Sequence, residues 1–173
     1  MVSVPHATGR LLFHLVCHYK PDTIIELGTA MGVSTLYLAM GRPETPVYSV
    51  EGNPQLALMA KNVFESLELN NINVIIENFD DALEQLNQHM TGRVLVFIDG
   101  NHTREAALRY YNAFAKSSGA NTIMVFDDIT WSTGMIEAWQ TICYYEINSC
   151  KIDLFKVGIV FRNQEPGGCI CYY

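Results

Sequence analysis

Hydrophobic positions along the chain change their spacing repeatedly between the pattern of a buried strand and that of an amphipathic helix. Short, nearly continuous apolar runs of strand length occupy 23–27, 47–51, 72–77, 93–99 and 121–128. Runs with apolar residues three or four positions apart, typical of helices, occupy 9–19, 33–40, 53–69, 81–90, 104–116 and 134–145. The segment 151–162 holds two further strand-like runs, which indicate a hairpin or a bent pair.

Strict alternation of buried strands with helices predicts a parallel sheet that is covered on both faces. Five strand–helix units precede the β–β tail, and no repeat, low-complexity segment or long linker interrupts them. We therefore predict one α/β domain over 1–173, with a doubly wound, Rossmann-like sheet and helices on both faces. One helix start is also indicated, because Asn53 is a good N-cap and Pro54 suits the first helical position.

Composition limits the classes of protein. The 173 residues are 49% hydrophobic and 17% charged, as in ordinary globular proteins. No apolar run approaches the roughly 20 residues that span a bilayer. His14, His18 and Lys20 interrupt the apolar patch nearest the N-terminus, so no secretory signal is predicted. The formal net charge of −7 argues against nonspecific nucleic-acid binding, which needs clustered lysines and arginines.

The cysteines are odd in number and widely spread. They are Cys17, Cys143, Cys150, Cys169 and Cys171. Only the last two are close together, and no second pair or histidine doublet completes a zinc set. We expect reduced thiols in a cytoplasmic protein.

The stretch "ELGTAMG", residues 26–32, joins the first predicted strand to the next helix. It places an acid, Glu26, inside an apolar strand and small residues at Gly28, Ala30 and Gly32. In open α/β sheets, ligands bind at the carboxyl ends of the strands. Small residues let the backbone approach such a ligand, and the helix that starts near Gly32 offers free N–H groups.

Two classes of ligand use a loop of this kind. A dinucleotide site carries G-x-G-x-x-G, whose third glycine would fall at Val33, and a carboxylate just before it would repel phosphate. An acid there suits a cationic ligand such as S-adenosylmethionine, which carries an amino group and a sulfonium. Glu51, at the end of the next strand, can accept hydrogen bonds from two ribose hydroxyls in either class. Together, Glu26 and Glu51 favour the methionine-derived cofactor.

The segment "ELGTAMGVSTLYLA" resembles motif I of class I S-adenosylmethionine-dependent methyltransferases. It is most similar to the branch of catechol and caffeoyl-CoA O-methyltransferases, whose bacterial members show E-x-G-T-x-x-G-x-S-T. The similarity extends from about residue 9 to 162. It implies a seven-stranded, mostly parallel sheet with one antiparallel strand, supplied by the β–β tail. It also implies methyl transfer from S-adenosylmethionine, here to an oxygen of a small molecule.

The resemblance implies cofactor-binding residues at the ends of four strands. They are Glu26, Gly28, Thr29, Gly32, Ser34, Glu51, Gly52, Phe79, Asp80 and Asp99. Glu26 and the loop glycines would line the methionine part, and Glu51 would hold the ribose. Phe79 and Asp80 would flank the adenine.

Three carboxylates, Asp99, Asp127 and Asp128, follow the fourth and fifth strands. Converging carboxylate oxygens are what Mg²⁺ or Ca²⁺ prefers, and the resemblance implies a metal site here, with Asp128 in place of an asparagine. The lysine that those enzymes carry three residues after the first acid is His102 in this chain. Histidine is a competent base or metal ligand. His102 and Asp99 are thus the candidate catalytic residues.

Structural alternatives exist for the same residues. His102 could be a surface histidine that caps its loop, and the acid pair could cap the following helix. Trp131 lies in the loop that flanks the expected substrate mouth, where it could pack on a substrate or on the cofactor.

The sequence predicts an S-adenosylmethionine-dependent methyltransferase acting on a small molecule, with no nucleic-acid or membrane partner. Two alternatives stay open: a nucleotide-binding oxidoreductase of Rossmann type, and a cofactor-binding module without catalysis. Relatives usually carry more chain before the helix at 9–19. A partner subunit, as in a homodimer, could cover the site, or N-terminal residues are missing from this chain, or the pocket is open.

Overall fold

The computed structural model describes residues 4–117 and 121–162, and it contains the strands and helices that the hydrophobic pattern predicts. The strands are β1 (Thr23–Leu27), β2 (Val47–Val50), β3 (Ile72–Ile75), β4 (Arg93–Ile98), β5 (Asn121–Phe126), β6 (Cys150–Asp153) and β7 (Gly158–Arg162). The helices are α1 (His6–Tyr19), α2 (Val33–Gly41), α3 (Pro54–Ser66), α4 (Phe79–Asn87), α5 (Arg104–Lys116) and α6 (Thr133–Tyr145).

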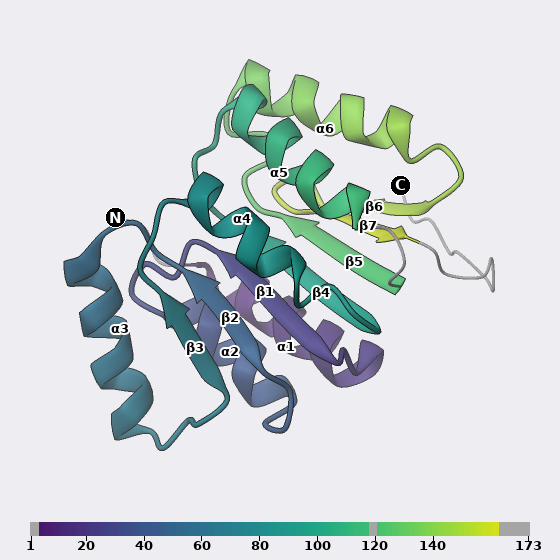
Figure 1. The fold of residues 1–173 in the computed structure, drawn as a ribbon. Coiled ribbons are helices and arrows are strands. Elements are labelled where there is room, and N and C mark those ends of the chain that lie inside the picture. Colours follow the sequence, from purple (N-terminus) through teal and green to yellow (C-terminus); the bar gives the residue numbers. More distant parts are fainter. Residues whose placement is uncertain (1–3, 118–120, 163–173) are drawn as a thin grey trace.

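The strands form one sheet in the order β3-β2-β1-β4-β5-β7-β6 (Figure 1). Strands β1 to β5 are parallel, whereas β7 runs antiparallel to both β5 and β6. The predicted mostly parallel sheet of seven strands with one antiparallel strand is confirmed. Strand order reverses between β1 and β4, which is where open α/β sheets bind ligands.

The register brings the ends of four strands into one row. Leu27 pairs with Val50 on one side and with Ile98 on the other, and Ile98 pairs with Phe126. The residues that follow these four therefore start four neighbouring loops at the same edge of the sheet. They are Gly28, Glu51, Asp99 and Asp127.

Helices cover both faces of the sheet (Figure 1). On one face, Leu12 of α1 and Leu38 of α2 pack in a cluster with Ile24 of β1. On the other face, Leu86 of α4 packs in a cluster with Ile25 of β1. Successive β1 side chains point to opposite faces, and each of the five is buried. This explains why the strand reads as a continuous apolar run.

Side chains cap the N-termini of three helices at the carboxyl edge, α3, α5 and α6. Asn53 accepts hydrogen bonds from the N–H groups of Gln55 and Leu56, which confirms the predicted cap of α3. Thr103 caps α5 and Ser132 caps α6 in the same way. These caps fix the entry of each helix directly after a loop of the carboxyl edge.

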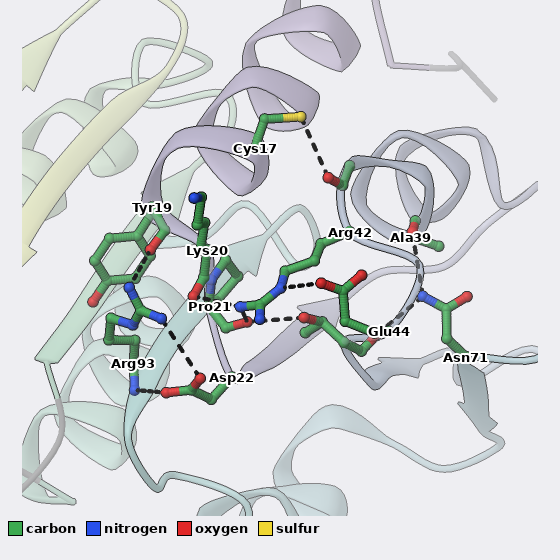
Figure 2. A network of polar contacts seen from close by, with 12 residues as sticks. Cys17, Tyr19, Lys20, Pro21, Asp22, Ala39, Arg42, Glu44, Asn71 and Arg93 are labelled. Atoms are coloured by element: carbon green, nitrogen blue, oxygen red, sulfur yellow. Dashed lines mark hydrogen bonds and ion pairs between the residues drawn. The ribbon is translucent and has the colours of Figure 1, made fainter.

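A polar network fastens the opposite, amino-terminal edge of the sheet (Figure 2). Arg42, after α2, donates from Nη1 to the carbonyl oxygens of Lys20 and Pro21, at 2.8 and 2.9 Å. Asp22 accepts from the N–H of Arg93 at 2.9 Å, so the start of β1 is tied to the start of β4. None of the residues named in this network lies at the carboxyl edge of the sheet.

Two further expectations concern cysteines and membranes. Cys17 and Cys143 are free, but Cys150 is disulfide-bonded, so the expectation of reduced thiols is wrong at Cys150. Cys169 and Cys171 lie outside the described residues. Within 4–117 and 121–162, none of the helices combines the length and the hydrophobicity that crossing a bilayer requires.

Candidate functional site

The loop 28–32 after β1 turns through a left-handed backbone at alternate residues. The φ angles are +111° at Gly28, +45° at Ala30 and +81° at Gly32. A Cβ on Gly28 would lie 2.2 Å from the carbonyl oxygen of Asp99, and one on Gly32 would lie 2.5 Å from the ring of Phe64. The small residues of this loop were expected to make room for a ligand. The loop after β4 and helix α3 approach so closely that they already require both glycines.

Glu26 is fully buried near the end of β1, with 0% of its surface exposed. Its Oε2 accepts hydrogen bonds from Thr35 Oγ1 at 2.6 Å and from Ser49 Oγ at 2.5 Å. Its Oε1 lacks a well-aligned hydrogen bond among the described residues. Burial raises the pKa of the Glu26 carboxyl, while neighbouring hydroxyls, including that of Ser34 on α2, lower it. A buried oxygen with an unused lone pair suits a ligand that brings a donor.

Thr29 faces the protein interior. Its Oγ1 lies 2.5 Å from Ser49 Oγ, and its N–H donates to the carbonyl of Val50. The hydroxyls of Thr29 and Ser49 thus continue the hydrogen-bonded chain that starts at Glu26. Thr29, which was expected to bind the cofactor through the loop, holds the loop onto β2.

Glu51 follows β2 and connects two loops. Its Oε2 accepts from the N–H of Ala30 and its Oε1 from the N–H of Asn53, each at 2.8 Å. A carboxylate oxygen can accept more than one hydrogen bond. Glu51 therefore keeps the capacity to accept from two hydroxyls while it fixes the loop 28–32 in place.

A cleft of about 560 Å³ opens beside Glu51, between the loops that follow β2, β3 and β4. Its lining consists of Glu51, Gly52, Asn53, Asn78, Phe79, Asp80, Asp81, Asn101 and Tyr110. Four residues expected to bind the cofactor, Glu51, Gly52, Phe79 and Asp80, are among them. The sequence interpretation missed Asn78, Asn101 and Tyr110.

Aromatic and charged groups shape the far wall of the cleft. The rings of Phe79 and Tyr110 meet edge to face with centroids 6.0 Å apart, and Asn101 Nδ2 donates to the hydroxyl of Tyr110. Asp80 accepts two hydrogen bonds from Arg109, at 2.6 and 3.0 Å. The carboxylate expected beside the adenine is therefore already held by a guanidinium, which fixes its direction.

His102 lies between two carboxylates at the other end of the β4 loop. Its Nε2 is 3.5 Å from Asp99 Oδ1 and 3.6 Å from Asp128 Oδ2. One ligand atom from each of these three residues lies within 4.8 Å of the other two. The structure thus brings together Asp99, His102 and Asp128, three of the four residues named for this cluster.

The protonation of Asp99 is shifted by its surroundings. Burial, and then the charges of Asp127, Glu26 and Asp128, raise its pKa to about 7. Its side chain is 20% exposed, so solvent screens these charges only in part. Asp99 exchanges its proton close to neutral pH, which is a feature of functional sites.

Asp127 is not a member of this three-residue group. It is 3% exposed, and its carboxylate faces Lys156, whose Nζ lies 3.9 Å from Asp127 Oδ2 and 3.2 Å from Asp128 Oδ1. The sequence interpretation missed Lys156, which comes from the turn between β6 and β7. The antiparallel direction of the last strand was the available signal, because it places the start of β7 beside the end of β5.

These residues do not fit a Mg²⁺ or Ca²⁺ ion well. Hard cations prefer six or more oxygen ligands. Here an imidazole stands between Asp99 and Asp128, and an ammonium occupies the flank of Asp128. The three-carboxylate metal site of Asp99, Asp127 and Asp128 stays a prediction.

Trp131 lies on the open side of the acid cluster. It is 70% exposed, and its ring centroid is 6.5 Å from that of His102. A large exposed aromatic ring beside a histidine and two acids can contact a molecule that approaches them. The place of Trp131 at the substrate mouth stays a prediction.

Comparisons with known proteins identify relatives. A family model described as a methyltransferase domain matches residues 25–129. Protein-L-isoaspartate O-methyltransferase of Hahella chejuensis is 37% identical over 71 residues, which cover 41% of this chain and 33% of that protein. A tRNA (guanine-N(7)-)-methyltransferase of Mycoplasma mobile is 34% identical over 80 residues, which cover 46% and 40%. The chain thus matches between a third and two-fifths of the length of these curated relatives.

Solved structures of O-methyltransferases share the fold. The O-methyltransferase TomG from Streptomyces achromogenes, in complex with SAM, superposes with a TM-score of 0.75 at 17% identity, covering 92% of this chain and 81% of that one. An O-methyltransferase from Bacillus cereus, in complex with SAH, gives 0.73 at 20% identity, covering 92% and 83%. Because the family match at 25–129 spans more than half of the sequence, this chain belongs to the methyltransferase domain family.

Proposed function

We propose that the chain transfers a methyl group from S-adenosylmethionine to a hydroxyl oxygen of a small molecule. The observation that carries this proposal is the position of His102, with Nε2 3.5 and 3.6 Å from two carboxylates. His102 lies one residue after Asn101, which lines the cleft beside Glu51. A proton acceptor therefore stands next to the place where family members hold their cofactor.

The cleft residues fit the cofactor that the family uses. Glu51 would accept from the ribose hydroxyls, and Phe79 and Asn78 would contact the adenine. Oε1 of Glu26, which lacks a well-aligned hydrogen bond among the described residues, would meet the cationic methionine end. When bound, S-adenosylmethionine supplies a methyl group on a sulfonium and leaves as the neutral thioether. The protein contributes orientation and the exclusion of water from the reacting atoms.

His102 would remove the proton that the acceptor hydroxyl loses. The proton moves to Nε2, and the imidazole becomes an imidazolium. Asp99 and Asp128 lie at ion-pair distance from that nitrogen and would stabilise its new charge. Because the pKa of Asp99 is raised to about 7, this support is complete only above neutral pH.

The acceptor is proposed to be a small molecule because the protein carries a net charge of −7. Nucleic-acid binding depends on clustered positive charge. One relative is named as a tRNA methyltransferase, so transfer RNA belongs in the test as a separate arm. A cytoplasmic location and a homodimer stay predictions, and gel filtration tests the second.

The experiment measures transfer of a labelled methyl group to a panel of small hydroxyl compounds and, separately, to transfer RNA. His102→Gln should lower kcat by about 10²–10⁴ while the dissociation constant of the demethylated cofactor stays the same. His89→Gln is the matched control, because His89 stacks on Tyr48 and does not line the cleft. Transfer only to RNA would contradict the small-molecule proposal. Binding of a nicotinamide cofactor in place of S-adenosylmethionine would favour the oxidoreductase, and binding without any transfer would favour the module.

A further inference from the structure

We propose that Lys156 is the resident cation of the acid cluster, and that its ammonium takes the place of a divalent metal ion beside Asp127 and Asp128. Methyl transfer would then proceed without a metal. This last consequence rests on the proposed function, but the place of Lys156 in the cluster does not. Lys156 belongs to none of the sequence motifs described above.

Backbone hydrogen bonds hold the turn that carries Lys156 next to Asp127 and Asp128. The turn between β6 and β7 is closed by the N–H of Leu154, which donates to the carbonyl of Val157, and by the N–H of Lys156, which donates to that of Leu154. The N–H of Ile129, directly after Asp128, donates to the carbonyl of Lys156 at 3.0 Å. The turn is thus joined to the acid loop at the residue that carries the ammonium.

Side chains anchor the same turn from the other side. Asp153 accepts from the N–H of Phe155 at 2.8 Å and from the indole N–H of Trp139 at 2.9 Å. Trp139 belongs to the buried cluster beneath the sheet, so the start of the turn is fixed to the core. The fold therefore fixes the backbone of Lys156 beside the acids, and its side chain, 41% exposed, extends from there to Asp128.

The carboxylates of Asp127 and Asp128 need a nearby positive charge to offset their mutual repulsion. Asp127 is 3% exposed, and its Oδ1 has no hydrogen-bond partner within the described part of the chain. Carboxylates this close repel one another strongly unless a positive charge compensates them. Lys156 Nζ, at 3.2 Å from Asp128 and 3.9 Å from Asp127, supplies that charge to both.

The same ammonium opposes a metal ion. A divalent cation bound to Asp128 would lie within a few ångströms of a positive charge, and like charges at that range repel appreciably even at an effective dielectric constant of about 20. Removal of Lys156 would leave Asp127 and Asp128 without their counter-charge, beside the candidate ligands Asp99 and His102. The structure therefore predicts that loss of the lysine creates a metal site.

Binding of Mn²⁺ to the full chain, measured by electron paramagnetic resonance, tests the inference. Lys156→Met should bind Mn²⁺ about 10- to 100-fold more tightly than the unmodified protein. Lys151→Met is the matched control: it removes one charge from the same hairpin, where Lys151 Nζ donates to the carbonyl of Glu146, and its Mn²⁺ affinity should not change. Lys156→Gln provides a second neutral variant, and circular dichroism verifies that each one folds.

Two results would overturn the inference. One is equal Mn²⁺ affinity in the unmodified protein and in folded Lys156→Met or Lys156→Gln. The other is micromolar binding of Mn²⁺ by the unmodified protein. Methyl transfer, assayed separately, should be insensitive to a chelator in the unmodified protein. If no acceptor is methylated, the proposed function fails, and the Mn²⁺ comparison still decides the role of Lys156.

Discussion

Glu51 at the end of β2 holds the backbone of Ala30, whose N–H donates to Oε2 at 2.8 Å. The residue expected to bind the ribose is thus also the residue that fixes the loop after β1. If Glu51 binds the ribose as predicted, cofactor binding and loop geometry depend on the same carboxylate. Substitutions at Glu51 must separate these two roles.

We predict that Glu51→Ala weakens binding of the demethylated cofactor by about 1.5–3 kcal/mol, because hydrogen bonds to a charged acceptor are lost. Glu51→Gln keeps one oxygen for the N–H of Ala30 and should lose less. Isothermal titration calorimetry gives both values. Unchanged affinity in Glu51→Ala would contradict the assignment to the ribose.

Gly28→Ala should destabilise the protein by about 2–4 kcal/mol in urea denaturation. The added Cβ meets the carbonyl oxygen of Asp99 at 2.2 Å, and φ at Gly28 is +111°. Gly52→Ala is the matched control within the cleft, because its Cβ would have no neighbour closer than 3.7 Å. If Gly28→Ala and Gly52→Ala were equally stable, the close contact between Gly28 and the carbonyl oxygen of Asp99 would be contradicted.

The unfolding free energy should depend on pH through Asp99. The pKa of this carboxyl is about 7 in the folded protein and 3.8 ordinarily. Between these values the folded protein binds more protons than the unfolded chain, so stability falls as pH rises towards 7. Asp99→Asn lacks the titrating carboxyl, so this loss of stability with rising pH should disappear. The stabilisation should be about 1–3 kcal/mol larger at pH 8 than at pH 5. Equal effects at the two pH values would argue against the raised pKa.

Trp131→Ala tests the substrate mouth. The side chain is 70% exposed, so its loss should change stability by less than about 0.5 kcal/mol. If its ring packs on the acceptor, KM for that acceptor should rise about five-fold, since an aromatic contact contributes about 1 kcal/mol. Tyr144→Ala, 74% exposed on α6, is the control and should leave KM unchanged. A KM that is the same in both variants would remove Trp131 from the acceptor site.

The fold could be predicted because each strand and helix follows from a local pattern. Short continuous apolar runs marked the strands, helical spacing of apolar residues marked the helices, and the resemblance supplied the antiparallel last strand. The cleft residues Glu51, Gly52, Phe79 and Asp80 could be predicted because they directly follow strands or open a helix. Tyr110 could not, because it lies well inside α5 and reaches the cleft only through the packing of α5 beside α4.

Side-chain direction limited the prediction of the acid cluster. Asp127 and Asp128 follow the same strand, but Asp128 adopts a left-handed backbone with φ of +55°, and of the two only Asp128 groups with Asp99 and His102. A sequence does not reveal that conformation, so Asp127 was expected beside Asp99. Lys156 was missed because its partners lie almost thirty positions earlier in the chain and share no motif with it.

The insertion of β7 between β5 and β6 has a consequence for biosynthesis. A ribosome delivers β5 and the acid pair long before β7, which is the last strand to emerge. During that interval β5 is an unpaired edge strand of the nascent chain, and Asp127 lacks the ammonium of Lys156. Unpaired edges invite contacts with other chains. A growing chain of this protein therefore stays vulnerable, and its acid cluster stays without Lys156, until the hairpin of β6 and β7 closes over both.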